Sequence, residues 1–181
     1  MKKKRALKEC IGFVIYLLVI FLATFLVIRY VGQRTKVSGS SMESTLSDGD
    51  NLIVDKISYR LHDPERFDII VFPYEYKENT YYIKRIIGLP NETVLITKDG
   101  DILINGEELT ESYGREVIKS AGTASEEVTL GPDEYFVLGD NRNYSSDSRA
   151  ADVGLIKRAD IIGKAWLRIY PFDKIGFIRH Q

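Results

Sequence analysis

The chain has 181 residues, of which 44% are hydrophobic and 28% are charged, and this composition excludes a disordered or collagen-like protein. The single cysteine, Cys10, excludes an intramolecular disulfide framework and a cysteine-rich zinc site. The two histidines, His62 and His180, are far apart in the sequence, which argues against a histidine metal cluster. We therefore expect no metal site built from cysteines or histidines.

The formal net charge of −1 conceals two parts of opposite sign. Residues 1–34 carry seven lysines or arginines and one glutamate, whereas the other 147 residues carry 18 basic and 25 acidic side chains. Because nucleic-acid binding requires a basic face, the acidic body argues against nucleic acid as a partner.

The first predicted element is an apolar helix over residues 11–28. These 18 residues carry no charge, and at about 1.5 Å per residue the helix spans roughly 27 Å, close to the roughly 30 Å hydrocarbon core of a bilayer. A cleaved signal peptide would have a shorter apolar run and a small-x-small cleavage site. The basic KKKR sequence before the run disfavours a buried core helix. We predict an uncleaved transmembrane anchor.

The charges around this helix predict its orientation. Residues 1–10 are rich in lysine, so the positive-inside rule places them in the cytoplasm. The protein is then expected to cross the cell membrane once, with the remaining domain, residues 29–181, on the extracytoplasmic side.

Short apolar runs rich in Ile, Val, Tyr and Phe follow the anchor, and turn sequences separate them. Asp99-Gly100 lies between two alternating runs and predicts a hairpin tip. Long helical periodicity is absent after the anchor, so the body is predicted to be mostly β, with a short helical turn over residues 44–48 and a polar surface excursion over residues 107–127. The expected strands are 51–54, 68–72, 81–87, 93–97, 101–104, 135–138 and 165–169.

A serine-rich segment is the first candidate for chemistry. Residues 38–46 hold five hydroxyl groups, and on composition alone a flexible linker would explain them. Met42 and Leu46 are unusual in a solvated linker. The segment lacks the second glycine of the α/β-hydrolase nucleophile elbow, so a serine nucleophile here would pair with another kind of base, such as a lysine. The alternative of a catalytic carboxylate pair gains no specific support, because the carboxylates are scattered.

Lys84 is the candidate base. Strand alternation places it on the face of Tyr82 and Ile86, and places its neighbour Arg85 on the opposite face. If the face of Lys84 points inward, desolvation lowers its pKa toward neutrality, as a lysine base requires. The alternative is an ordinary strand lysine that faces water. A third segment, residues 139–149, reads by itself as a polar loop.

Taken together in the order in which they occur along the chain, these three segments resemble the sequence boxes of bacterial type I signal peptidases. These enzymes are the membrane-bound Ser/Lys proteases that remove signal peptides from exported proteins. SGSSMESTL resembles the nucleophile box, GDNLIVDK the next box, YYIKRIIGLPNETV the general-base box and GDNRNYSSDSR the last box. The resemblance extends from the anchor to the C-terminus and is closest to Gram-positive members. It implies a coiled β-sheet catalytic domain of the signal-peptidase type, which needs no metal ion and no cofactor.

The resemblance implies a role for each matched residue. Ser41 is implied to be the nucleophile, Lys84 the general base, and Ser145 the residue that hydrogen-bonds and orients the lysine. Asp140 is implied to pair with Arg85. The further ion-pair members implied to shape the site are Asp147 and Arg149.

The resemblance also implies the substrate and the partners. Shallow apolar pockets would accept small side chains before the cleaved bond, the Ala-x-Ala type of specificity, and the peptide would bind as an added β-strand. The implied partners are signal peptides of secretory preproteins and membrane lipid, close to the protein-export machinery. The implied pocket residues are Val37, Met42, Leu46, Tyr82 and Ile83.

Two positions depart from the family pattern. Ser44 stands where the family usually has proline, and Gly39 stands where some members have a serine that helps the oxyanion hole. The hole would rest on backbone N–H groups, principally that of Ser41, and one such donor is worth roughly 10²–10³ in rate.

Two other functions fit parts of the sequence. A self-cleaving Ser/Lys protease of the repressor type shares the dyad, but the anchor argues against it. The alternative from another class is a catalytically minor paralogue that acts as an assembly factor or chaperone for cell-surface structures. Because Ser41 and Lys84 are both present, we rank the peptidase above this alternative.

Overall fold

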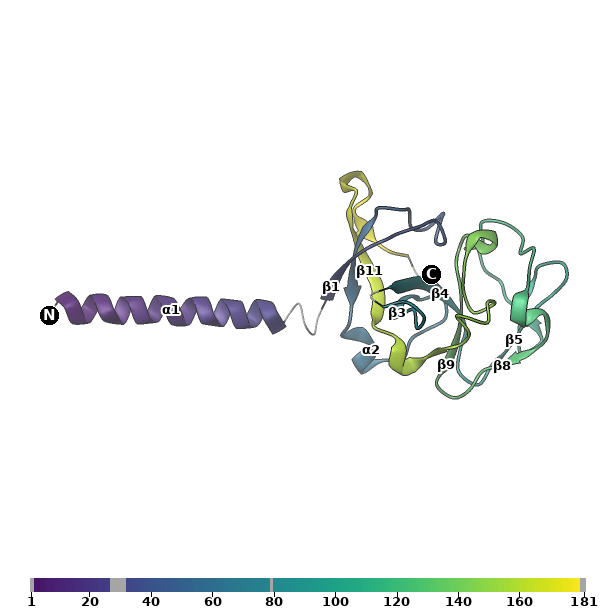
Figure 1. Ribbon diagram of the computed structural model, residues 1–181, viewed down its shortest axis with the longest axis horizontal. Helices are drawn as coiled ribbons and strands as arrows, with labels where there is room; N and C mark the ends of the chain where they lie inside the picture. The colour runs from purple at the N-terminus through teal and green to yellow at the C-terminus, as the bar shows by residue number, and fades with distance from the viewer. Residues whose placement is uncertain (1, 27–31, 79, 180–181) are drawn as a thin grey trace.

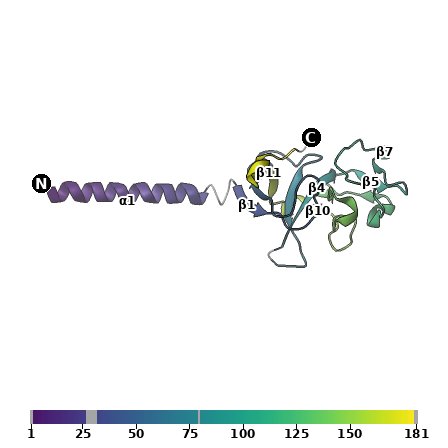
Figure 2. The ribbon, with the colours of Figure 1, turned by 90° about the horizontal axis from the view of Figure 1, so that it is seen from above.

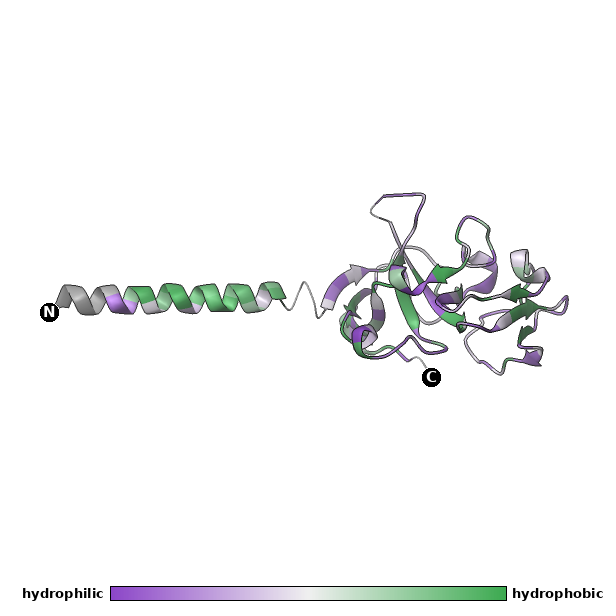
Figure 3. Cartoon of the chain, turned by 90° about the horizontal axis from the view of Figure 1, so that it is seen from below, coloured by the Kyte–Doolittle hydropathy of each residue, from purple (hydrophilic) through white to green (hydrophobic). Residues whose placement is uncertain are grey.

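The computed structural model describes residues 2–26, 32–78 and 80–179, with a long N-terminal helix, α1 (Lys2–Leu26), and a β-rich body that begins at Gly32 (Figure 1). Within α1, Lys8–Leu26 is long and apolar enough to cross a membrane, and none of it is buried against the body. Figure 3 shows the apolar character of this helix. The alternative of a buried core helix is therefore wrong. Residues 27 and 28, where the predicted anchor ends, lie outside the described residues.

The body contains two antiparallel sheets. The larger has the strand order β1-β2-β11-β3-β4-β9-β10, with β12 paired to β11, and the smaller has the order β7-β6-β5-β8. The smaller sheet lies beyond β9, on the side of the body away from β1 (Figures 1 and 2). The larger sheet comprises β1 (Gly32–Lys36), β2 (Asn51–Asp55), β3 (Ile69–Pro73), β4 (Tyr81–Gly88), β9 (Glu134–Leu138), β10 (Ile156–Lys157), β11 (Gly163–Tyr170) and β12 (Gly176–Phe177).

Short elements complete the body. The smaller sheet comprises β5 (Thr93–Ile96), β6 (Ile102–Ile104), β7 (Glu107–Glu108) and β8 (Val128–Thr129). The short helices are α2 (Ser58–Leu61), η2 (Gly122–Ser125), η3 (Arg142–Tyr144), η4 (Arg158–Asp160) and η5 (Phe172–Lys174).

The predicted mostly β body is confirmed, and each of the seven predicted strands is present within a few residues of its expected bounds. The predicted hairpin tip is also confirmed, because β5 and β6 pair antiparallel around it and Gly100 has a φ of 91°, which favours glycine. The five strands that were not predicted are short or polar. For example, β1 reads GQRTK and β7 consists of two glutamates, so neither carries an apolar alternation.

Two local predictions need correction. The helical turn predicted over residues 44–48 lies earlier, because the Leu46 N–H donates to the Met42 carbonyl at 2.8 Å. The segment 107–127 is mostly exposed, as expected of a surface excursion, but Ile118 and Ala124 are buried in the core. Both corrections have the same cause: apolar side chains within polar segments pack onto distant strands.

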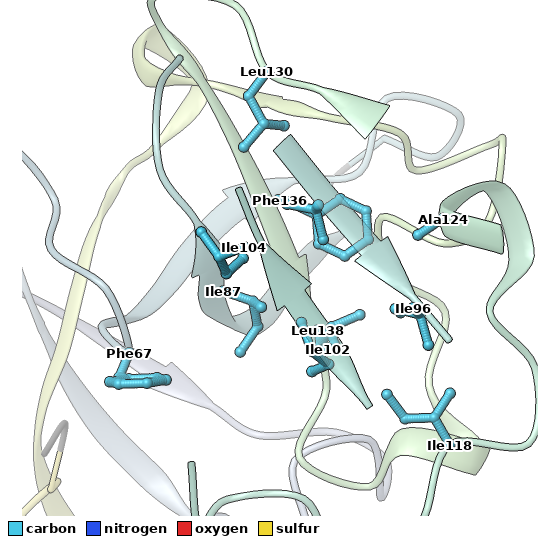
Figure 4. Close-up of a cluster of buried hydrophobic side chains, with 11 residues drawn as sticks. Phe67, Ile87, Ile96, Ile102, Ile104, Ile118, Ala124, Leu130, Phe136 and Leu138 are labelled. Carbon is cyan, nitrogen blue, oxygen red and sulfur yellow. The ribbon is translucent and has the colours of Figure 1, made fainter. Parts of the chain in front are cut away.

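Strand β4 is central to the core. All of its residues from Ile83 to Gly88 are buried, as expected of an apolar run covered on both faces. Ile83, Ile86 and Ile87 each contribute to a different apolar cluster. Figure 4 shows the cluster that joins the two sheets, in which Phe136 from β9 and Ile87 from β4 face the side chains of β5 and β6. The strand that carries Lys84 is therefore held on both sides.

We expect Phe136→Ala to lower the free energy of unfolding by about 3–5 kcal/mol, because the lost ring leaves a cavity between the two sheets. Phe136 is fully buried in the cluster of Figure 4. Chemical denaturation of the detergent-solubilised full-length chain measures the change. Val117→Ala is the control, because Val117 is 70% exposed, and it should stay within about 0.5 kcal/mol of the wild type. Equal losses in the two variants would contradict this account of the core.

Candidate active site

Ser41 lies at the start of a turn in the loop that connects β1 to β2. Hydrogen bonds between Val37 and residues 49 and 50 close the base of this loop. Met42 and Leu46, one helical turn apart, are both buried in the apolar cluster beneath it. The serine-rich segment is therefore a packed turn and not a flexible linker, because two apolar side chains fix it to the sheet.

Lys84 points from β4 toward this turn. Its Nζ donates a hydrogen bond to Ser41 Oγ at 2.8 Å and another to the Ile83 carbonyl at 3.1 Å, and the residue is only 3% exposed. Burial lowers the pKa of Lys84 from 10.5 to about 8, while the negative charges of Asp147 and Asp140 act in the opposite direction. The alternative of a lysine that faces water is wrong.

This arrangement can transfer a proton. A general base must lie within hydrogen-bond reach of the proton that it accepts, and its pKa should be near the working pH. The Ser41 hydroxyl and the Lys84 amine satisfy the distance, and the lowered pKa leaves a substantial neutral fraction of the amine near pH 8. The pair can therefore generate a nucleophilic serine oxygen.

The hydrogen bond expected from Ser145 to Lys84 is not formed. Ser145 Oγ is buried and has no hydrogen-bond partner in the described part of the chain, whereas Lys84 Nζ bonds to Ser41 and to the backbone. Ser145 still lies beside the nucleophile: a methyl group on Gly139 would overlap both Ser145 Oγ and the Ser41 carbonyl oxygen. The hydrogen-bond partners of Lys84 Nζ therefore lie in its own strand and in the serine turn, not in the loop that carries Ser145.

Arg85 and Asp140 form a bidentate pair on the other face of β4. The Arg85 Nε to Asp140 Oδ1 distance is 2.8 Å, the NH2 to Oδ2 distance is 2.7 Å, and both side chains are fully buried. Arg85 also donates to the Phe67 carbonyl and stacks on the ring of Tyr113, with 3.6 Å from Cζ to the ring centroid. Because Arg85 lies in β4 and Asp140 lies in the loop after β9, the pair joins this loop to the strand.

Asp147 and Arg149 form a second bidentate pair. Both of its N–O distances are 2.8 Å, and Asp147 also accepts a hydrogen bond from the Gly139 N–H at 3.1 Å. Arg149 reaches the segment 107–127 by donating to the Ser120 carbonyl. This pair therefore folds the loop 139–149 onto itself and places a carboxylate near Lys84.

Three further residues contact the site but were not predicted from the sequence. Thr45 Oγ1 donates to Asp140 Oδ2 at 2.5 Å, and Asn141 donates to the carbonyls of Ser40 and Ser41. Thr45 and Asn141 both lie within matched boxes, and this position is the sequence signal that could have identified them as candidates. Tyr113, which covers Arg85, lies in a polar segment with no signal that distinguishes it.

A cavity of about 600 Å³ opens at Ser41 and Lys84. It is bordered by Val37, Met42, Tyr82 and Ile83, which are four of the five residues expected to contact substrate. Leu46, the fifth, does not border it, because its side chain is fully buried behind Met42 in the underlying cluster. The cavity beside the serine therefore has a mixed lining, in which these apolar side chains alternate with hydroxyl and lysine side chains.

The described residues offer no metal site, since residues 2–26, 32–78 and 80–179 contain no cluster of three or more His, Cys, Asp or Glu side chains suited to a metal ion. Cys10, the single cysteine of the sequence, is exposed on α1. The functional groups that border the cavity include the Ser41 hydroxyl and the Lys84 amine.

The family model for signal peptidase, peptidase S26, matches residues 10–170. The chain belongs to the signal peptidase family. It is 39% identical over 154 residues to a probable signal peptidase I-2 of Synechocystis sp., covering 82% of this chain and 68% of the relative. It is 36% identical over 181 residues to signal peptidase I P of Bacillus subtilis subsp. natto, covering 96% of each.

A crystal structure of a signal peptidase I from Enterococcus faecalis is 36% identical, with a TM-score of 0.47 over 57% of this chain and 97% of that one. The family expected from the four boxes is confirmed by the family model and by the curated relatives. The enzyme class, a serine peptidase and therefore a hydrolase, is confirmed with it.

Replacing the buried lysine is expected to stabilise this signal peptidase at neutral pH. The pKa of Lys84 is about 8 in the folded chain and 10.5 for a lysine in water, so the unfolded chain binds more protons between these values and stability rises with pH there. Below pH 8 the penalty of burying the charge is about 3 kcal/mol. Lys84→Met removes this penalty, so we expect a gain of up to that size at pH 7 that shrinks toward pH 10.5.

Chemical denaturation of the full-length chain in detergent at several pH values measures this gain. Lys98→Met is the matched control, because Lys98 is exposed in the turn between β5 and β6 and its replacement should change stability little at any pH. A Lys84→Met chain that is no more stable than the wild type at pH 7, or whose gain is independent of pH, would contradict the buried-charge account.

Proposed function

We propose that this chain is a membrane-anchored serine endopeptidase that removes N-terminal signal peptides from exported preproteins, with Ser41 as the nucleophile and Lys84 as the general base. The observation that carries the proposal is the 2.8 Å hydrogen bond between Ser41 Oγ and the Nζ of a buried lysine whose pKa is lowered to about 8. Family membership supports the class of substrate.

In the proposed mechanism, neutral Lys84 accepts the hydroxyl proton while Ser41 Oγ bonds to the carbonyl carbon before the cleaved bond. The electron pair of the C=O double bond moves to the oxygen, which the Ser41 N–H stabilises. The Lys84 ammonium then donates its proton to the departing amine of the mature protein. The signal peptide remains as an ester on Ser41 until a water molecule, deprotonated by Lys84, releases it and the serine regains its proton.

The ion pairs are proposed to act by position. Arg85–Asp140 holds the loop 139–149 against β4, and Asp147–Arg149 folds that loop onto itself. The arginines also neutralise two carboxylates whose charges would otherwise raise the pKa of Lys84 further. These four residues therefore preserve a lysine that is neutral often enough to act as a base.

The apolar residues that border the cavity are proposed to select substrates that have small side chains at the first and third positions before the cleaved bond, the Ala-x-Ala type. Val37, Met42, Tyr82 and Ile83 border the cavity beside the dyad. Tyr82 is held by stacking on Tyr74, with ring centroids 4.6 Å apart. A substrate that binds there as an extended strand would place its main chain within reach of Ser41.

The anchor is proposed to extend over residues 11–28, of which 11–26 lie in α1, with residues 1–10 in the cytoplasm and the catalytic domain, residues 29–181, outside. The described part of α1 ends at Leu26 and β1 begins at Gly32, so the chain between them spans at most roughly 20 Å. The body is therefore proposed to stay near membrane lipid, where the cleavage region of a translocated preprotein leaves the export machinery.

We expect the detergent-solubilised full-length chain to cleave an Ala-x-Ala preprotein after the second alanine, and Ser41→Ala and Lys84→Ala to lower kcat/KM by roughly 10⁴-fold or more. The rate should rise with pH and level off above a midpoint near 8, because only the neutral amine accepts a proton. Lys98→Ala, a control distant from the cavity, should behave as the wild type. A flat pH profile with chemistry rate-limiting would contradict the lysine base. A folded but inert wild type would favour the assembly-factor alternative.

Deleting residues 1–31 should leave cleavage of soluble peptides within a few-fold of the full-length chain and impair processing of membrane-inserted preproteins, because the tether raises the local concentration of enzyme. This boundary keeps β1, where Arg34 donates to Asn51 Oδ1 at 2.7 and 3.0 Å. Parallel assays on a peptide and on proteoliposomes measure the two activities. Equal losses on both substrates would show that the segment does more than tether.

A further inference from the structure

Asn141 holds the backbone on both sides of the nucleophile. Its backbone N–H donates to the Ser41 carbonyl at 3.0 Å, and its side-chain Nδ2 donates to the Ser40 carbonyl at 3.1 Å. The Ser40 carbonyl also accepts from the Glu43 N–H at 3.1 Å. Asn141 is 3% exposed and lies about 100 residues after the serine, at the start of η3. One buried residue therefore binds two successive carbonyl groups of the serine turn.

These bonds determine where the Ser41 N–H points. The Ser40 carbonyl and the Ser41 N–H belong to one planar trans peptide group, so they point in opposite directions. A bond that holds the carbonyl toward Asn141 thus turns the N–H away from it. Ser40 and Ser41 both border the cavity, and within the described ranges no acceptor pairs with the Ser41 N–H. This donor is consequently free and its direction is restrained.

We propose that Asn141 is a positioning residue that aims the Ser41 N–H at the oxyanion. This inference rests on the proposed Ser/Lys mechanism and adds a residue to it. Position 39 is glycine, so it has no side-chain hydroxyl to offer the oxyanion, and its own N–H is engaged with Asp48 Oδ1 at 2.8 Å. Transition-state stabilisation therefore depends on backbone donors, and a backbone donor keeps its direction only if its peptide plane is held.

The proposal predicts a particular kinetic signature. Loss of the Asn141 side chain should lower kcat by about 10- to 100-fold, less than the roughly 10²–10³-fold of a deleted donor, since the Glu43 N–H still holds the Ser40 carbonyl. KM should stay within about twofold, because the donor acts on charge that develops in the transition state. The midpoint of the pH profile should not move, because Asn141 makes no hydrogen bond to Lys84 in the described structure.

The test uses full-length Asn141→Ala and Asn141→Leu in detergent, beside the wild type. Asn143→Ala is the matched control, because Asn143 lies in the same η3 turn and its amide bonds to Glu116 and to the Val117 carbonyl instead. Besides kcat, KM and pH profiles on an Ala-x-Ala peptide, the inhibition constant of a peptide aldehyde ending in alanine is measured. Ser41 Oγ adds to the aldehyde carbon while its proton passes to Lys84, and the electron pair of the C=O double bond moves to the aldehyde oxygen, which occupies the oxyanion position.

Support requires that aldehyde affinity and kcat/KM fall by the same factor in the Asn141 variants and stay at the wild-type level in Asn143→Ala. Unchanged aldehyde affinity, or a shifted pH midpoint, would overturn the proposal, because a packing defect or an effect on Lys84 would then explain the loss. Asn141→Leu keeps the branched shape and the number of side-chain heavy atoms, and it carries the test if Asn141→Ala does not fold. An active wild type with unaffected variants overturns this inference alone, whereas a folded and inert wild type overturns the proposed function.

Discussion

The burial of one lysine ammonium constrains the structure around it. Lys84 is 3% exposed, and at neutral pH its charge must be accommodated by a serine hydroxyl, a backbone carbonyl and the ring of Tyr82. Two carboxylates act on it, Asp147 and Asp140, but each is bound by its own arginine. Desolvation therefore outweighs the attraction, and the pKa of the lysine falls. The same burial makes the site costly for the fold and useful for proton transfer.

Support for this lysine comes from segments that are far apart in the chain. Strand β4 is covered on both faces, so Lys84 on one face and Arg85 on the other are fixed by the same backbone. The loop 139–149 reaches the serine turn through Asn141 and reaches Thr45 through Asp140. The segment 107–127 then covers this loop, with Tyr113 stacked on Arg85. The turn, the strand and the loop thus hold one another in place.

Those features of the site that depend on neighbouring residues in the sequence could be predicted. Alternation along one strand separated Lys84 from Arg85, because successive side chains point to opposite faces. The two residues that differ from expectation, Ser145 and Leu46, differ for tertiary reasons: one makes no hydrogen bond to the lysine, and the other is buried behind Met42. Asn141 lies in the last box and was a candidate for that reason, but its hydrogen bonds to the Ser40 and Ser41 carbonyls could not be predicted, because bonds to distant backbone atoms leave no residue pattern in one sequence.

The sequence by itself determined the apolar helix, the seven main strands and the hairpin tip, because each depends on spacing and turn chemistry within a few residues. It also identified the family, since four short segments occur in a specific order. Only the tertiary structure decided that Lys84 is buried and lies 2.8 Å from a serine 43 residues away. Desolvation and hydrogen-bond distance depend on which atoms surround a group, and those atoms come from segments that meet only when the sheet is complete.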